Sequence, residues 1–143
     1  MELPEDIYDQ VETLSAKGCE LFDDADFSAA ITKWSEALDL LPEPKSGWEA
    51  YTWLSASIGD GYYQLTDLNA ARQAFFDALN GPDGQENPFV HYRLGQCEIR
   101  LGNEESGISH LLKAYMLDGE EIFSGESDGQ SYLQRLKDKA LIP

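Results

Sequence analysis

The sequence has few basic residues and few cysteines. Its 143 residues include 10 lysines and arginines against 27 aspartates and glutamates, which gives a formal charge of −17. Binding to nucleic-acid phosphates or anionic lipids needs clustered basic side chains, so we expect no nucleic-acid or membrane partner. Cys19 and Cys97 occur without a CxxC pair or a histidine at metal-ligand spacing. Two reduced thiols are therefore the favoured interpretation.

Long apolar runs and a basic leader are also missing. No stretch approaches the ~20 apolar residues that cross a bilayer. The first ten residues, MELPEDIYDQ, are acidic where a signal peptide is basic and then apolar. The 16 aromatic residues supply core material for a chain of single-domain length. These features predict one soluble, cytoplasmic domain.

The usual signatures of catalysis are absent. The sequence contains no GxSxG, no P-loop and no GxGxxG before a helix. With 27 carboxylates, acid pairs occur at any spacing and say little about acid–base catalysis. The acidic turn at 23–26 lacks the glycine and glutamate of a calcium loop, because Ala29 and Ser35 hold those places. His91 and His110 have no ligand-type neighbours in sequence, so we expect no metal and no cofactor. No motif supports an enzyme activity and none is expected, with an enzyme that lacks these motifs as the remaining alternative.

A unit repeated three times accounts for most of the chain. Each copy has a glycine, a small residue twelve positions later, a large apolar residue four further on, and a second small residue three after that. The glycines are Gly18, Gly59 and Gly95; the small residues are Ala30, Ala71 and Gly107, then Ala37, Ala78 and Ala114; the large residues are Trp34, Phe75 and Leu111. Shared spacings in three copies identify an internal repeat.

Each copy is expected to form two antiparallel helices. Apolar residues recur at helical spacing, and the small residues allow the two helices to approach closely. The large residue is expected to fill the space between one helix pair and the next. The segments expected to be helical are 11–22, 27–41, 53–65, 68–80, 89–101 and 104–117.

These residues resemble the tetratricopeptide repeat. That family's pattern is a glycine after an apolar residue, an aromatic residue three positions on, an Ala-x3-Phe pair and a proline. It is matched by Gly18, Leu21, Ala30, Trp34 and Pro42, by Ile58, Gly59, Tyr62, Ala71 and Phe75, and by Leu94, Gly95 and Leu111. The third copy departs from the pattern at Glu98 and Gly107. The spacing between the first two copies exceeds that of the family, and we place the extra residues in 42–52 as a longer linker and an added first turn on the third helix.

The resemblance implies an all-α fold, a right-handed stack of three antiparallel helix pairs with a C-terminal capping helix. We expect a single domain over 1–143, with repeats at 8–42, 47–82 and 87–119, a loop at 119–128 and a capping helix at 129–140. The apolar face of that helix is expected to comprise Tyr132, Leu133, Leu136 and Ala140. Ile122 and Phe123 are expected to pack against the third repeat.

The first helices of the pairs are expected to line a groove that binds another protein. The groove residues are Trp53, Asp60, Tyr63, Phe89, Tyr92, Gln96 and Arg100. Aromatic side chains of this kind supply binding hot spots. Phe22 and Ile99 lie on the same faces, with a place in the core as their alternative. Because Arg100 is the one basic residue of this face, a groove that grips chaperone carboxylates is not expected.

The aspartates of the first turn, Asp23, Asp24 and Asp26, are expected to steer a basic partner toward the protein. The alternative is that the negative charge serves solubility alone.

Segments 41–63, 87–107 and 114–123 resemble short, acidic bacterial tetratricopeptide proteins that are predicted to be immunity proteins of polymorphic toxins. The resemblance implies a non-enzymatic module that binds and neutralises a cognate toxin, with a basic toxin domain as its partner. A cytoplasmic secretion chaperone or a scaffold adaptor that uses the same groove is the alternative.

Overall fold

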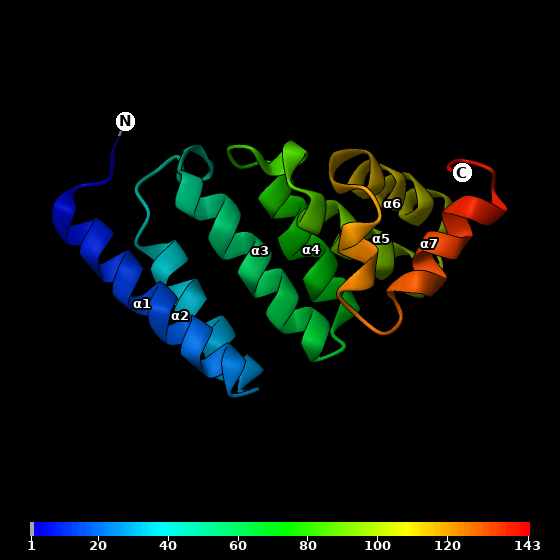
Figure 1. The fold of residues 1–143 in the computed structure, drawn as a ribbon. Coiled ribbons are helices and arrows are strands. Elements are labelled where there is room, and N and C mark those ends of the chain that lie inside the picture. Colours follow the sequence, from blue (N-terminus) through cyan, green and yellow to red (C-terminus); the bar gives the residue numbers. More distant parts are fainter. Residues whose placement is uncertain (1) are drawn as a thin grey trace. The chain divides into compact units, whose positions relative to one another are not determined.

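The computed structural model describes residues 2–143, which form seven α-helices and three 3₁₀ segments and contain no β-strand. The helices are α1 (Glu5–Asp23), α2 (Phe27–Asp39), α3 (Glu49–Gln64), α4 (Leu68–Leu79), α5 (Pro88–Arg100), α6 (Glu104–Asp118) and α7 (Gly129–Asp138). The 3₁₀ segments are η1 (Lys45–Gly47), η2 (Gly84–Glu86) and η3 (Glu121–Ser124). The prediction of an all-helical fold is confirmed (Figure 1).

The described residues divide into two compact units. The N-terminal unit ends at Gly84 and the C-terminal unit begins at Gln85. Each unit has its own cluster of buried apolar side chains, so each is described by itself.

The N-terminal unit consists of α1 to α4. Successive helices pack against one another, and α1 and α2 run side by side (Figure 1). The core includes Val11, Ile31, Trp34, Leu41, Trp48, Leu54 and Ile58. Because α3 begins at Glu49, the added first turn predicted for this helix is confirmed. In the linker before it, Lys45 Nζ donates to the carbonyls of Leu41 at 2.8 Å and Asp39 at 3.0 Å, which satisfies the C-terminal end of α2.

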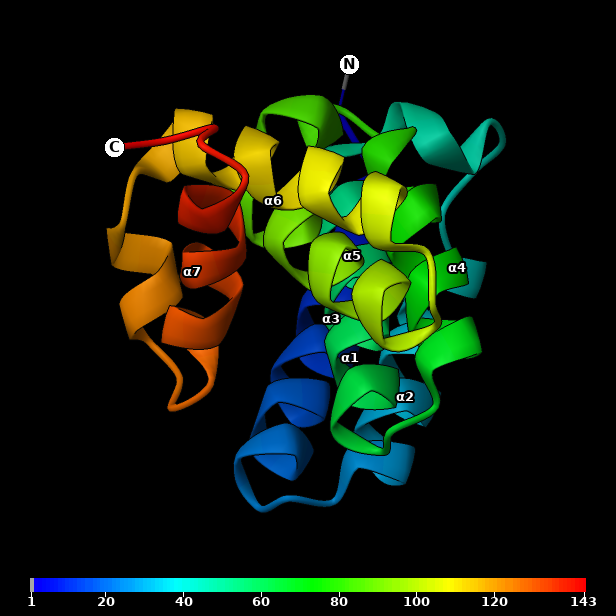
Figure 2. The same cartoon turned by 90° about the vertical axis from the view of Figure 1, so that its right-hand side faces the viewer.

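The C-terminal unit consists of α5, α6, η3 and α7. Helices α5 and α6 pack against each other, and η3 and α7 lie next to each other (Figure 2). The core includes Tyr92, Ile108, Leu111, Phe123, Tyr132, Leu133 and Leu136. Asn87 caps α5 by accepting from the amides of Phe89 and Val90, and Pro88 occupies the first turn, where its missing amide costs nothing.

In each repeat, the large apolar side chain packs against the glycine of the same helix pair. A Cβ atom would lie 2.6 Å from Trp34 Cδ1 at Gly18, 2.9 Å from the Phe75 ring at Gly59, and 2.6 Å from Leu111 Cγ at Gly95. All three side chains fill the hollow that the missing Cβ leaves within their own pair, and the expectation that they fill the space between pairs is confirmed for Trp34, which lies 3.7 Å from the Cβ position of Gly61 on α3. Trp34 also reaches α3, where its ring contacts Trp53.

The turns within the three pairs share one backbone feature. Ala25, Thr66 and Gly102 have φ angles of 62°, 61° and 92°, in the left-handed region. In each turn the following residue donates its amide to the carbonyl five positions earlier, which closes the C-terminal end of the helix. The positive angle is therefore part of the repeat, although glycine supplies it in the third copy alone.

The segment that joins α6 to α7, residues 119–128, is called the strap below. It contains η3, so the loop predicted there has local helical structure. Phe123 is fully buried and meets the Tyr92 ring edge-on, with centroids 5.2 Å apart. Ile122 is partly buried against the same cluster. The prediction that these two side chains pack against the third repeat is confirmed.

The final helix differs from its prediction at its end. Tyr132, Leu133 and Leu136 are buried, as expected. Helix α7 ends at Asp138, and Ala140 is exposed with a φ angle of 58°. The placement of Ala140 on the apolar face is therefore wrong, because the chain has already left the helix there. Ile142 is buried and joins the core instead.

Candidate functional site

Trp53 is the predicted groove residue that offers a large apolar surface in the N-terminal unit. Its side chain is 47% exposed. Asp60 is half-buried, and its Oδ1 accepts from Gln64 Nε2 at 3.4 Å. Tyr63 is buried, so it presents little surface. A partner that used this face would meet Trp53 first.

The inner side of the Trp53 ring packs against a series of aromatic rings. Trp34 meets it edge-on, with centroids 6.3 Å apart and an interplanar angle of 85°. Phe22 lies 5.8 Å from Trp34, and Phe27 lies 5.0 Å from Phe22. Trp34 is fixed in turn by a hydrogen bond from its Nε1 to the Ser15 carbonyl at 3.3 Å. The exposed ring is therefore mounted on a rigid support, which lowers the entropy lost on binding.

Cys19 lies beside this series and is partly buried. Burial raises the pKa of its thiol, the Asp23 carboxylate raises it further, and a hydrogen bond involving Trp34 opposes them in part. The thiol thus stays protonated at neutral pH, which does not suit it to act as a nucleophile.

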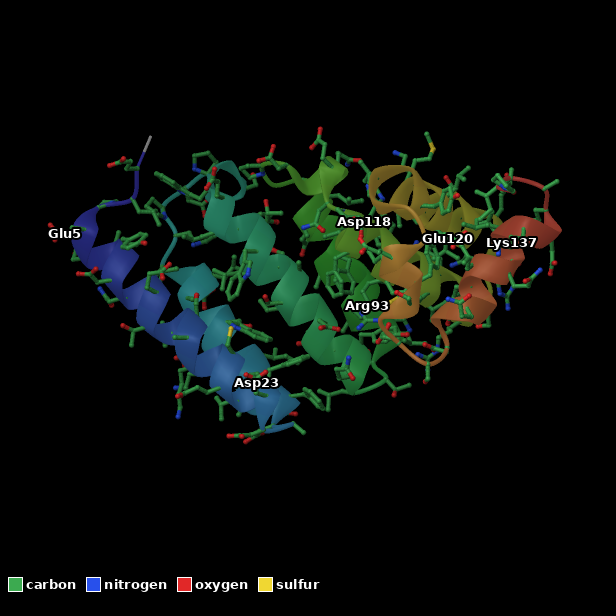
Figure 3. The ribbon with its side chains drawn as sticks, viewed as in Figure 1. Glu5, Asp23, Arg93, Asp118, Glu120 and Lys137 are labelled. Atoms are coloured by element: carbon green, nitrogen blue, oxygen red, sulfur yellow. The ribbon has the colours of Figure 1, made fainter. Side chains whose placement is uncertain are left out.

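Negative charge is concentrated in the N-terminal unit. This unit holds 17 acidic and 4 basic residues, a formal charge of −13, whereas the C-terminal unit holds 10 acidic and 6 basic residues, a formal charge of −4. Asp23, Asp24 and Asp26 are exposed in the turn between α1 and α2. Glu5 and Asp23 mark the two ends of α1 (Figure 3). The aromatic surface of Trp53 and the acidic helix α1 thus belong to the same unit.

The predicted groove residues of α5 are mostly covered. Tyr92 is 2% exposed and Gln96 is fully buried, so neither offers surface to a partner in this structure. Phe89 is half-buried and Arg100 is exposed. The role of these residues in partner binding stays a prediction, and for Tyr92 and Gln96 it would require the strap to move.

Arg93 holds the strap to α5. Its guanidinium donates to Glu126 through both terminal nitrogens, at 2.6 Å and 3.0 Å, and to Gln96 Oε1 at 2.9 Å. The Arg93 side chain is 6% exposed, and its Cζ lies 5.1 Å from the centroid of the Phe89 ring. Arg93 faces the strap in Figure 3. Bidentate pairing in a desolvated place is the strongest form of carboxylate recognition by a side chain.

The contact with Arg93 lowers the pKa of the Glu126 carboxyl group. Burial alone would raise its pKa, but the hydrogen bonds and charge of Arg93, with help from Gln96 and Tyr92, outweigh burial and hold the pKa below its ordinary value. Glu126 is therefore ionised at neutral pH. The role of Arg93 was not predictable from the sequence, because its partner lies 33 residues away.

His91 and His110 form a stacked pair in the C-terminal unit. Their Nδ1 atoms are 3.1 Å apart, and their ring centroids are 5.3 Å apart. His91 Nε2 lies 2.8 Å from the Gln85 carbonyl, which accepts and so fixes the proton on that nitrogen. Burial lowers the pKa of His91, and Lys113 lowers it further, against the effect of Gln85. A neutral His91 then accepts at Nδ1 from His110, so the pair is a partly buried polar contact.

Two further features are absent from the described residues, namely a cluster of metal-ligand side chains and a helix that could span a membrane. Nowhere in residues 2–143 do three histidine, cysteine, aspartate or glutamate side chains gather as metal ligands. None of the helices described is long and apolar enough to cross a membrane. Cys19 and Cys97 are both thiols.

No protein-family model matches this sequence, and no curated protein is similar enough to count as a relative. Solved structures do share its fold. One described as "First TPR of Spaghetti (RPAP3) bound to HSP90 peptide SRMEEVD" matches with a TM-score of 0.71 and covers 94% of this chain and 95% of that chain. The two sequences are 15% identical, so the likeness concerns the fold. The chain therefore has a tetratricopeptide-like helical fold.

Proposed function

We propose that this protein is a non-enzymatic binding module that neutralises a basic toxin domain, as the immunity proteins it resembles in sequence are predicted to do. The observation that carries the proposal is Trp53, half-exposed on a rigid aromatic support within a unit of charge −13. The indole supplies the buried anchor that holds a complex together, and the acids raise the rate of encounter with a basic surface.

Trp53→Ala is expected to weaken the complex by about 2 kcal/mol, or roughly 30-fold in Kd, because an aromatic anchor at the centre of an interface is lost. The proposal implies that the toxin gene lies beside this one, so the product of the neighbouring gene is co-expressed and scored by growth rescue, and its affinity is measured by calorimetry. Leu65→Ala is the matched control, since Leu65 is an equally exposed apolar side chain of the same unit. Equal affinity of both variants would place the interface elsewhere, and the absence of growth rescue would contradict the toxin proposal.

A secretion chaperone or adaptor is the second candidate. The observation that favours it is the likeness of fold to a domain bound to a peptide. The peptide bound to that domain, SRMEEVD, is acidic, and the charge of the N-terminal unit would repel such a segment. An adaptor would bind its client without protecting a cell from it, so growth rescue separates the two candidates.

A further inference from the structure

One side of α3 carries an aromatic ring between two carboxylates. Glu49, Trp53, Ala56 and Asp60 follow one another at spacings of four, three and four residues, so they form one row along the same side of the helix. Glu49 is exposed, Trp53 is half-exposed and Asp60 is half-buried, whereas Ala56 is small and buried. Along this row, the Trp53 ring is therefore not separated from either carboxylate by a large side chain.

The ring and the nearer end of the row are held in place. Gln64 Nε2 donates to Asp60 Oδ1 at 3.4 Å, one helical turn further along α3. A carboxylate has about four acceptor positions, so Asp60 can accept from Gln64 and from a ligand together. Trp53 is positioned by its edge-on contact with Trp34. Both groups are thus oriented before a ligand arrives, which lowers the entropy lost on binding.

The basic side chains of the N-terminal unit are engaged at other places. Their contacts are Lys17 with Glu20 at 3.6 Å, Lys33 with Glu36 at 3.5 Å, Lys45 with the carbonyls at the end of α2, and Arg72 with the centroid of the Phe76 ring at 4.9 Å. Within residues 2–84, none of these contacts is with Trp53. An indole face attracts cations, and the carboxylates on both sides of it strengthen that attraction. A cation for this ring therefore has to come from a partner.

We propose that the row on α3 binds an arginine side chain of the partner protein, with the guanidinium flat on the Trp53 ring and its N–H groups directed along the helix toward Asp60 and Glu49. The inference rests on the proposed function and names the residue through which a basic partner binds. A guanidinium is planar, so it stacks on an indole and donates within its own plane at the same time. The ammonium group of lysine is compact and more strongly hydrated, so arginine is preferred.

The probe is the synthetic peptide acetyl-Gly-Arg-Gly-amide, titrated into the full-length protein. Two matched peptides carry lysine, or the uncharged arginine analogue citrulline, at the central position. Proton–nitrogen correlation NMR of the indole N–H groups follows binding, and Trp53→Phe assigns the Trp53 signal. The indole N–H groups of Trp34 and Trp48 donate to the carbonyls of Ser15 and Pro42 and serve as internal controls.

The Trp53 signal is expected to shift to saturation with a Kd on the order of millimolar, while the signals of Trp34 and Trp48 stay in place. The arginine peptide should bind about threefold more tightly than the lysine peptide and at least about tenfold more tightly than the citrulline peptide.

Asp60→Asn keeps an oxygen that accepts from Gln64 and should weaken binding of the arginine peptide about threefold. Asp39→Asn is the matched control, because it removes the same charge at an exposed position on α2. If Asp60→Asn unfolds the protein, Glu49→Gln in the exposed first turn of α3 is the second variant, with the same expectation.

Equal binding of the arginine peptide and either matched peptide, or no shift of the Trp53 signal with any of them, would overturn the proposal. Equal weakening by Asp60→Asn and Asp39→Asn would show that net charge alone attracts the peptide, which also overturns it. The titration needs no toxin, and growth rescue needs no arginine peptide. A failure of this inference is therefore distinguished from a failure of the proposed function.

Discussion

Thr66 occupies a backbone position that suits glycine better. Its φ angle of 61° lies in the left-handed region, where a β-branched side chain is strained. The repeat spacing predicts that Thr66 is equivalent to Gly102, because each lies seven positions after its repeat glycine. The angle itself was not predictable from the sequence, since Ala25 and Thr66 carry no glycine signal.

Thr66→Gly is expected to raise the free energy of unfolding by about 1 kcal/mol, because relief of the strained angle outweighs the greater freedom of glycine in the unfolded chain. Urea denaturation measures the change. The reverse substitution, Gly102→Thr, is the control and should lower stability by a similar amount. A loss of stability in Thr66→Gly would mean that its side chain contributes a contact larger than the strain.

At the level of elements, the sequence predicted six of the helices closely. Pro42, Gly102 and Gly119 stop three of them near the expected positions, because proline cannot continue a helix and glycine readily ends one. The main miss is α1, which begins at Glu5, six residues before its first predicted residue. Its first turn holds Glu5 and Asp6, which stabilise a helix N-terminus by charge.

The sequence predicts that the strap connects two helices, but it does not predict how the strap is folded and held. Glycines and acids mark 119–128 as a loop, and Phe123 signals that part of it is buried. The strap is held by the contact between Glu126 and Arg93. No local sequence pattern indicates a pair of residues so far apart in the chain. For the same reason Tyr92 and Gln96 were assigned to an open surface that the strap in fact covers.

Glu126→Gln is expected to lower stability by about 2 kcal/mol at neutral pH, because a buried guanidinium loses its charged partner. The pKa of Glu126 is lower in the folded protein than its ordinary value of 4.5, so its contribution is complete above that value and is lost as the pH falls through the folded pKa. Wild type and variant should therefore become more alike in acid. Thermal unfolding across this range tests the prediction, with exposed Glu120→Gln as the control, and a difference that does not depend on pH would contradict it.

At the scale of the whole molecule, charge is distributed unevenly along the chain. The N-terminal unit carries −13 of the total of −17. A field of this kind acts on encounter more than on dissociation, because exposed charges steer a partner before contact and are screened by salt.

Replacing three aspartates by asparagine, at Asp23, Asp24 and Asp26, is expected to lower the rate of association with a basic partner about threefold or more at low salt. The rate of dissociation should change little. Stopped-flow measurements at several ionic strengths provide the test. The control neutralises Asp118, Glu120 and Glu121 with the matching amides, so that the net charge falls equally in the C-terminal unit. Equal slowing by both sets would show that total charge matters and the position of the acids does not.

The positions of the tryptophans determine which part of the protein their fluorescence can follow during unfolding. All three tryptophans, Trp34, Trp48 and Trp53, lie in the N-terminal unit. Indole emission therefore follows the unfolding of that unit alone, whereas far-ultraviolet circular dichroism follows helices in both. Coincident melting curves from the two signals would mean that the units unfold as one cooperative block, and separate curves would give each unit a melting temperature of its own.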